Sequence, residues 1–137
     1  MGNAKETLNY FLKGIVIEMI IMSGIVFFKT KIREKIVEFY VNKVEMSIWL
    51  EQKDCTILKH GNLLLGFCQR DKPDIEGMIT FFYPTREEVD KMYERFKKIS
   101  NGPPKENPRY QIYHFFTKDP EGRNLEFQHF MHALKPI

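Results

Sequence analysis

A carboxylate and an imidazole near the carboxyl end of the chain, Glu126 and His114, could act together as a general base. Glu126 falls on a predicted strand whose side chains alternate between two faces. Leu125 and Phe127 point to one face, and the opposite, polar face carries Asn124, Glu126 and Gln128. A polar face that bears a carboxylate can line a pocket, although a solvated sheet surface gives the same pattern. For His114, packing among aromatic side chains is the alternative to catalysis.

Other side chains could complete such a site. Aromatic residues could form its walls, Cys68 could pair with His114 as a nucleophile, and Arg70 or Arg123 could receive an anion. For each aromatic residue, a place in the core is the alternative. We therefore predict Glu126 and His114 as catalytic groups, together with a ligand-binding set: Trp49, Cys68, Phe82, Phe116, Asn124 and Gln128.

Composition favours one globular domain over a disordered or nucleic-acid-binding chain. The 137 residues are 43% hydrophobic and 28% charged, which is enough for a substantial core. The net charge of +3 is small and dispersed, so we expect no nucleic-acid partner.

Cys55 and Cys68 form no CxxC pattern and suggest no disulfide framework. We expect both to be unpaired, apolar strand residues in a reducing cytoplasm.

The amino-terminal segment is apolar but fits neither a membrane span nor a signal peptide. Residues 10–28 are nearly long enough to cross a bilayer, but Lys13 and Glu18 interrupt them. We expect a short helix over residues 6–12, then an extended run to Met22. We interpret residues 1–22 as an extension, with Met19 or Met22 as a candidate native start.

The sequence contains an internal repeat. Residues 24–40 align without a gap to residues 77–93, at a constant offset of about 53 residues. The glycines that open the two segments match, as do the tyrosines that close them. Each copy predicts a strand followed by a helix, so the domain spans residues 23–132 as two modules, 23–70 and 77–132.

Local signals define the elements of each module. Thr85 and Glu88 form a capping box, and Val89, Met92, Phe96 and Ile99 follow at helical spacing. Residues 43–52 alternate as a strand with Met46, Ile48 and Leu50 on one face. Two strands follow around a turn at residues 60–62. In the second module, residues 100–108 read as a polar loop, and strands cover residues 111–118 and 123–130.

These features resemble the vicinal oxygen chelate superfamily, which includes glyoxalase I, bleomycin-resistance proteins and extradiol dioxygenases. The resemblance rests on the doubled βαβββ pattern, on residues 34–40 of the first helix, and on the closing stretch FTKDPEGRNLEF at residues 116–127. It implies an α+β fold in which two βαβββ modules form a curved mixed-sheet cup, with the helices outside and the ligand within.

The resemblance implies a metal site that this sequence does not complete. Metal-dependent members hold a divalent cation with four His or Glu side chains from the first and last strands of the modules. Glu126 matches one of these places, but the others fall on Ile25 and Met78 and near Gly66. None of these three is a ligand for zinc, nickel, manganese or iron. We therefore predict no metal and no cofactor.

Two functions are compatible with these observations. The first is a cytoplasmic protein that binds a small molecule in the cup without the usual metal. The alternative is a lyase or dioxygenase-type enzyme with a displaced or degenerate metal site that uses Glu126. Whether it is an enzyme, and whether the cup closes within one chain or within a homodimer, stays open.

Overall fold

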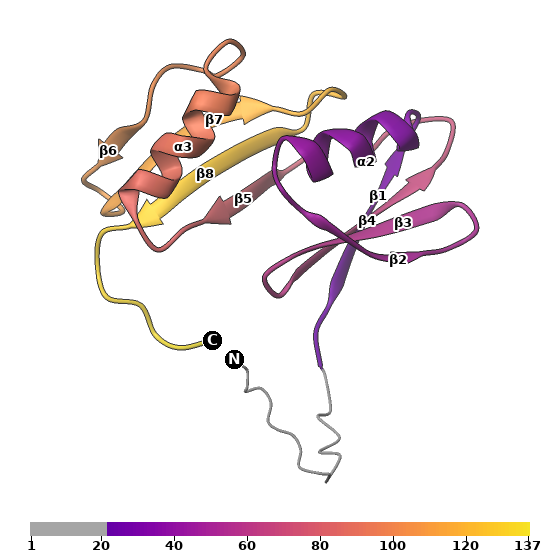
Figure 1. The fold of residues 1–137 in the computed structure, drawn as a ribbon, viewed down its shortest axis with the longest axis horizontal. Helices are drawn as coiled ribbons and strands as arrows, with labels where there is room; N and C mark the ends of the chain where they lie inside the picture. The colour runs from indigo at the N-terminus through magenta and orange to yellow at the C-terminus, as the bar shows by residue number, and fades with distance from the viewer. Residues whose placement is uncertain (1–21) are drawn as a thin grey trace, which may run out of the picture.

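The computed structural model describes residues 22–137, so the interpretation of the amino-terminal extension lies outside the described residues. Two modules follow each other with the same order of elements (Figure 1). The first consists of β1 (Ile25–Thr30), α2 (Arg33–Asn42), β2 (Ser47–Glu51), β3 (Cys55–His60) and β4 (Leu63–Gln69). The second consists of β5 (Met78–Phe82), α3 (Arg86–Phe96), β6 (Lys105–Asn107), β7 (Ile112–Lys118) and β8 (Asn124–Phe130).

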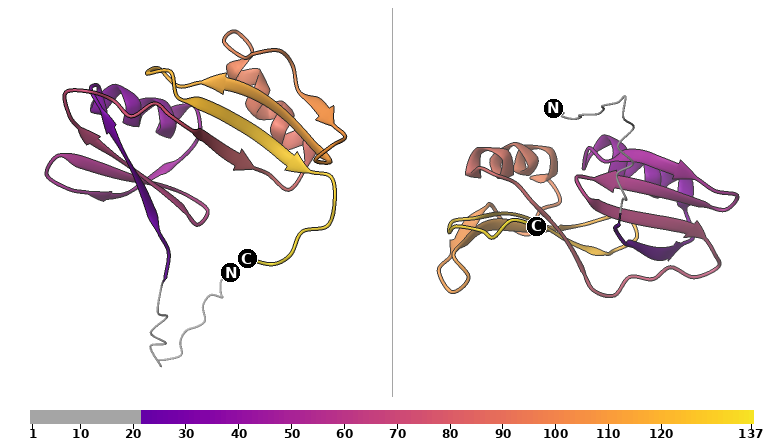
Figure 2. Two further views of the ribbon diagram at one scale, coloured as in Figure 1. Left: turned by 180° about the vertical axis from the view of Figure 1, so that it is seen from behind. Right: turned by 90° about the horizontal axis from the view of Figure 1, so that it is seen from below.

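Each module forms its own four-stranded mixed sheet, in the orders β1-β4-β3-β2 and β5-β8-β7-β6 (Figure 2). The first and last strands of a module run parallel, and the other neighbours are antiparallel. The predicted fold class, α+β with two βαβββ modules, is confirmed. The two sheets remain separate and do not close into one continuous sheet.

Each helix begins where a side chain accepts a hydrogen bond from one of its first backbone amides. The Thr85 hydroxyl accepts a hydrogen bond from the Glu88 amide at 3.2 Å, which confirms the predicted cap of α3. No side chain caps α2 from its own N-cap position, but the Gln69 side chain accepts from the Arg33 amide at 3.0 Å. That contact fixes the start of α2 to the end of β4.

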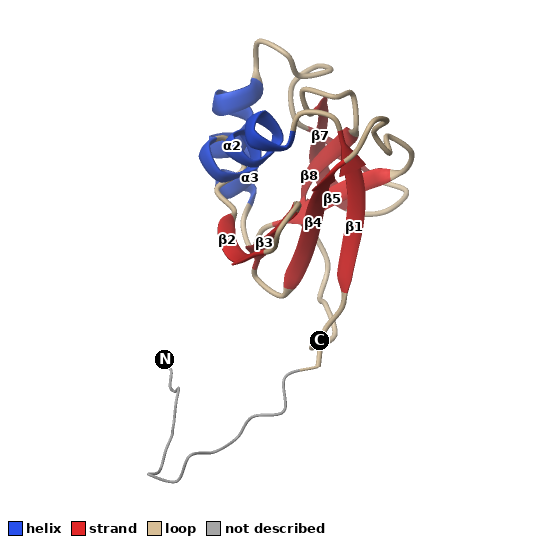
Figure 3. Cartoon of the chain, turned by 90° about the vertical axis from the view of Figure 1, so that its right-hand side faces the viewer, coloured by secondary structure: helices blue, strands red, loops and turns tan. Residues whose placement is uncertain are grey.

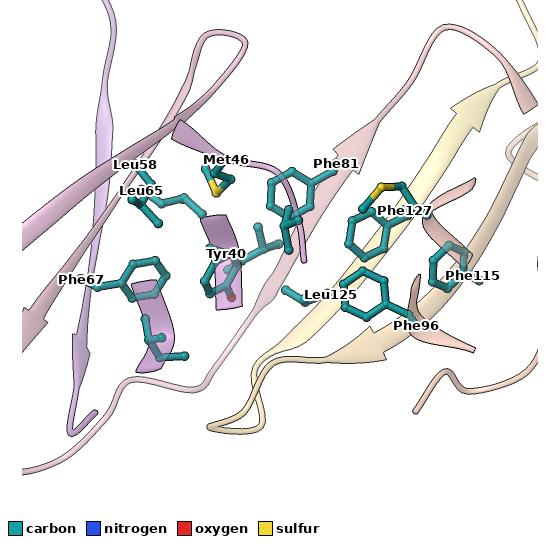
Figure 4. Close-up of a cluster of buried hydrophobic side chains, with 14 of the residues drawn as sticks. Tyr40, Met46, Leu58, Leu65, Phe67, Phe81, Phe96, Phe115, Leu125 and Phe127 are labelled. Atoms are coloured by element: carbon teal, nitrogen blue, oxygen red, sulfur yellow. The ribbon is translucent and has the colours of Figure 1, made fainter. Parts of the chain in front are cut away.

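Both helices lie on the same side of the two sheets (Figure 3), and one hydrophobic core runs beneath them. In the first module, Tyr40 from α2 stacks on Phe67 from β4, with ring centroids 5.0 Å apart. In the second, Phe127 from β8 stacks on Phe81 and Phe115. Figure 4 shows these rings as one cluster spanning both modules. Within residues 22–137 no helix covers the other face of each sheet, which we call the helix-free face.

Residue pairing assigns side chains to the helix-free face. In the first sheet it includes Phe27, Gly66 and Ile57, which are neighbours across β1, β4 and β3. In the second sheet Thr80, Glu126 and Phe116 are neighbours across β5, β8 and β7. Leu125 and Phe127 point into the core and are fully buried, as the alternating pattern predicts.

Two details differ from the sequence interpretation. Met46, Ile48 and Leu50 do not share one face, because the strand register shifts between Ile48 and Leu50. The shift pairs Ile48 with Leu58 and Leu50 with Ile57, which lie on opposite faces of β3. The segment 100–108, read as a loop, contains the three-residue strand β6.

The turn between β7 and β8 joins the two modules. The Thr30 hydroxyl at the end of β1 donates to Glu121 at 2.6 Å, and the Lys31 amide donates to the same carboxylate at 2.9 Å. Arg123 is 1% exposed, forms ion pairs with Asp119 and Glu121, and donates to the Lys29 carbonyl at 2.7 Å. Arg123 therefore holds the modules together and cannot serve as the predicted anion receptor.

Candidate functional site

Glu126 stands at the centre of the second sheet, on the helix-free face. Its Oε1 accepts a hydrogen bond from the Thr80 hydroxyl on β5 at 2.8 Å. Its Oε2 lies 2.6 Å from Nδ1 of His114 on β7. The side chains of Glu126 and His114 are only 13% and 6% exposed. Both carboxylate oxygens are thus held by neighbouring strands, which satisfies a largely buried acidic group.

The contact with Glu126 orients the His114 ring. When Glu126 is ionised it only accepts hydrogen bonds, and Nδ1 of His114 is then the donor in this pair. In that tautomer of a neutral imidazole the second ring nitrogen, Nε2, has a lone pair that is free to accept. The Phe116 ring packs edge-on against the imidazole at 4.8 Å and limits its movement. An imidazole held in one tautomer by a carboxylate is an arrangement that can accept a proton.

Apolar side chains border this pair. Met78 and Phe82 on β5 share its face and are 49% and 45% exposed. Phe82 packs edge-on against Phe130, with ring centroids 5.4 Å apart. Gln128 lies between Phe82 and His114 in the register and is 7% exposed. The pair therefore forms a polar centre with an accessible apolar margin.

Asn124 lies at the start of β8, on the same face as Glu126. Its side-chain oxygen accepts a hydrogen bond from the Lys118 ammonium group at 2.7 Å. Of the predicted site residues, the structure thus gathers six on one face of the second module: Phe82, His114, Phe116, Asn124, Glu126 and Gln128.

The remaining two predicted residues, Trp49 and Cys68, lie in the first module. Trp49 is half exposed, at the register shift of β2. Cys68 forms a disulfide with Cys55, its direct partner across β3 and β4. The expectation of two unpaired cysteines is therefore wrong, and Cys68 has no thiol with which to form a nucleophile pair. Disulfides persist mainly in oxidising environments, so the two cysteines no longer support the expectation of a reducing compartment.

Thr80 is the contact that the sequence interpretation missed. It lies between Met78 and Phe82 in the alternating stretch MITFF, so its face could be inferred from the alternation. Its contact with Glu126 could not be inferred from the sequence, because Thr80 meets Glu126 only through the parallel register of β5 and β8. The repeat alignment pointed instead to Met78, which is the register partner of Asn124.

The side chains present do not complete the metal site that the resemblance implies. Met78 shares the face of Glu126 but offers only a thioether. In the first module the Phe27 ring lies directly on Gly66, where a Cβ atom would overlap it. Within residues 22–137 there is no group of three or more His, Cys, Asp or Glu side chains arranged to hold a metal ion. We therefore derive no chemistry through a metal.

Comparison with solved structures identifies the fold. A glyoxalase/bleomycin resistance protein/dioxygenase from Alicyclobacillus acidocaldarius matches with a TM-score of 0.66 and 17% identity, over 81% of this chain and 92% of that one. A protein with the same description from Nocardioides matches with a TM-score of 0.65 and 18% identity, over 90% and 93%. A lactoylglutathione lyase from Agrobacterium tumefaciens matches with a TM-score of 0.62 and 18% identity, over 80% and 92%.

No protein-family model matches the sequence, and no curated protein matches it. The structural comparisons are therefore evidence about fold. The chain has the vicinal oxygen chelate fold, and the resemblance inferred from its closing motif is confirmed at that level. None of the helices within residues 22–137 has the length and hydropathy needed to cross a membrane.

Proposed function

We propose that the chain binds a small molecule on the helix-free face of the second sheet, without a resident metal ion. The observation that carries this proposal is that hydrogen bonds from Thr80 and His114 occupy both carboxylate oxygens of Glu126. A cation at Glu126 would compete with these contacts, and within residues 22–137 no group of three or more His, Cys, Asp or Glu side chains is placed to hold it. Tight metal binding needs several such ligands.

The surroundings of the pair suggest the chemistry of the ligand. Met78 and Phe82 offer half-exposed apolar surface, while His114 Nε2 offers an acceptor. A neutral aromatic molecule with one hydroxyl group suits this combination, because its ring contacts the apolar margin and its hydroxyl donates to the imidazole. A homodimer and a cytoplasmic location stay predictions.

Metal analysis and a binding titration test the proposal. We expect zinc, nickel, manganese and iron in the purified protein at far less than one ion per chain. We expect p-cresol, used as a probe, to perturb the NMR amide signals of Thr80, His114 and Glu126 in a saturable way. The variant Glu126→Gln should weaken this binding, and Glu106→Gln, at an exposed carboxylate, should not. Stoichiometric metal that disappears in Glu126→Ala would overturn the proposal.

A second function is supported by the orientation of His114. With Nδ1 held by Glu126, Nε2 could remove a proton from a carbon next to a carbonyl group, as in lyase-type chemistry. Deuterium incorporation from heavy water into hydroxyacetone, followed by proton NMR, tests this. The enzyme hypothesis requires incorporation above background that is lost in His114→Ala. Equal rates for the two proteins would leave binding as the function.

A further inference from the structure

We infer a second binding pocket, at the junction of the two modules, for an amphipathic anion with an apolar body and one acidic head group. The pocket has a volume of about 610 Å³. It is formed by α2, the loop after α3, the end of β7 and the β7–β8 turn. Its lining includes Phe39, Lys43, Ile99, Phe116, Lys118 and Pro120. This volume lies within the range of small-molecule sites.

The pocket does not include the Glu126–His114 pair, because neither residue contributes to its lining. Phe116 and Asn124, which the strand register places on the same face as that pair, do line it. It opens where β7 extends past β6, which pairs only with residues 112–114. There the Asn101 amide donates to the Phe116 carbonyl at 2.9 Å, so the loop after α3 closes the strand edge and forms one wall.

Most of the exposed wall is apolar. Phe39 of α2 is half-buried and packs edge-on against Phe96, which holds its ring in place. Ile99 is 56% exposed, although it lies next to these rings. Pro120 adds a further apolar surface from the turn. The exposed isoleucine and the neighbouring aromatic rings together offer an apolar surface on which an apolar ligand can pack.

The two lysines of the pocket give it a positive charge that no carboxylate among the described residues neutralises. Lys118 donates to the neutral amide oxygen of Asn124 at 2.7 Å. Lys43 donates to the backbone carbonyl of Arg95 at 3.1 Å and lies over the Phe96 ring. Neither lysine forms an ion pair within residues 22–137.

Asp119, the one acidic side chain among the described lining residues, does not offset this charge. Asp119 is 5% exposed, and its Oδ2 accepts from Tyr40 and Arg123. Its Oδ1 accepts from the backbone amides of Glu121 and Arg123. Because Asp119 is fully paired, the charge available to a ligand is that of Lys43 and Lys118. A medium-chain carboxylate complements both the charge and the apolar wall.

A titration with decanoate, followed by amide NMR signals of the full chain, tests this inference. We expect saturable changes at residues 39, 43, 99, 101 and 116–120, and weaker binding of the uncharged decanol. The double variant Lys43→Gln/Lys118→Gln should weaken decanoate binding by about tenfold, which corresponds to about 1.4 kcal/mol. The matched variant Lys72→Gln/Lys91→Gln removes two exposed lysines outside the pocket and should bind decanoate like the parent.

Three outcomes would overturn the inference: changes confined to Thr80, His114 and Glu126, equal affinity for decanol and decanoate, or unchanged decanoate binding after loss of both pocket lysines. The variant Glu126→Gln separates this inference from the proposed function. It should leave decanoate binding unchanged while weakening the binding of p-cresol, so either site can fail without the other.

Discussion

The hydroxyl of Tyr40, on α2 of the first module, donates a 2.7 Å hydrogen bond to the Asp119 carboxylate in the β7–β8 turn of the second. Both side chains are almost completely buried. Burial and the adjacent Asp119 charge raise the pKa of Tyr40 well above its ordinary value. The phenol therefore remains a donor to Asp119 at all ordinary pH values, and this bond contributes to joining the modules.

Replacing Tyr40 by phenylalanine should weaken the whole fold. The variant Tyr40→Phe retains the ring stacked on Phe67 but removes one donor from a buried carboxylate. We expect it to lower the free energy of unfolding by about 1.5–3 kcal/mol, as for hydrogen bonds to charged groups. Urea unfolding measures the change. Tyr113→Phe removes a similar tyrosine–aspartate bond at an exposed position and should cost far less. Equal losses would contradict this interpretation.

Glu121 should make stability depend on pH in the acid range. Burial raises its pKa, but hydrogen bonds from Thr30, the Lys31 amide and Arg123, with the Arg123 charge, outweigh burial and lower it overall. A carboxyl group whose pKa is lower in the folded state stabilises the fold above its unfolded pKa. That contribution is lost as the pH falls through the folded pKa. We therefore expect stability to decrease as the pH falls from about 5 towards 3.

Urea midpoints measured between pH 7 and pH 3 test the role of Glu121. The variant Glu121→Gln should be less stable than the parent at pH 7 and should lose less stability on acidification. Glu94→Gln alters an exposed carboxylate on α3 and should retain the parent's pH dependence. The assignment fails if the Glu121→Gln curve runs parallel to that of the parent.

The disulfide should stabilise the first sheet. It closes a loop between residues 13 positions apart in sequence, and a loop of that size is worth about 3 kcal/mol in the unfolded-state entropy account. We expect a reducing agent to lower the unfolding midpoint of the parent and to leave Cys55→Ser/Cys68→Ser unaffected. Thiol titration of the unfolded, unreduced protein should find no free thiol. Two free thiols per chain would contradict the pairing.

Side-chain alternation in the sequence was sufficient to predict the face of Glu126. Because β8 is regular, the two-residue period placed Leu125 and Phe127 in the core and Glu126 on the opposite face. The same reasoning failed in β2, where one residue at the register shift moves Ile48 and Leu50 to opposite faces. A single extra residue leaves no mark in the composition of a short strand.

The contacts that join the modules could not be predicted from the sequence, because they depend on how distant segments meet. Thr30 and Glu121 are 91 residues apart, and Tyr40 and Asp119 are 79 apart. The closing stretch at residues 116–127 was recognised as a local motif, and a local motif carries no information about the partner module. The disulfide could not be predicted for the same reason, because it follows from the register of β3 and β4.

In the first module the Phe27 ring covers Gly66, near which the resemblance places one of the missing metal ligands. The Phe27 ring lies on Gly66, which has an ordinary backbone conformation that alanine can adopt. A methyl group at this position would overlap the ring and displace it. We expect Gly66→Ala to lower the free energy of unfolding by about 1–3 kcal/mol, the usual cost of overpacking.

The same change in a Phe27→Ala background should cost nothing or stabilise the protein. Without the ring, the added methyl group meets no obstacle, and alanine in a strand is favoured over glycine by about 0.5–1 kcal/mol. Urea unfolding of the parent, both single variants and the double variant gives the interaction energy between the two positions. An equal cost of Gly66→Ala with and without the Phe27 ring would mean that something other than Phe27 covers this glycine.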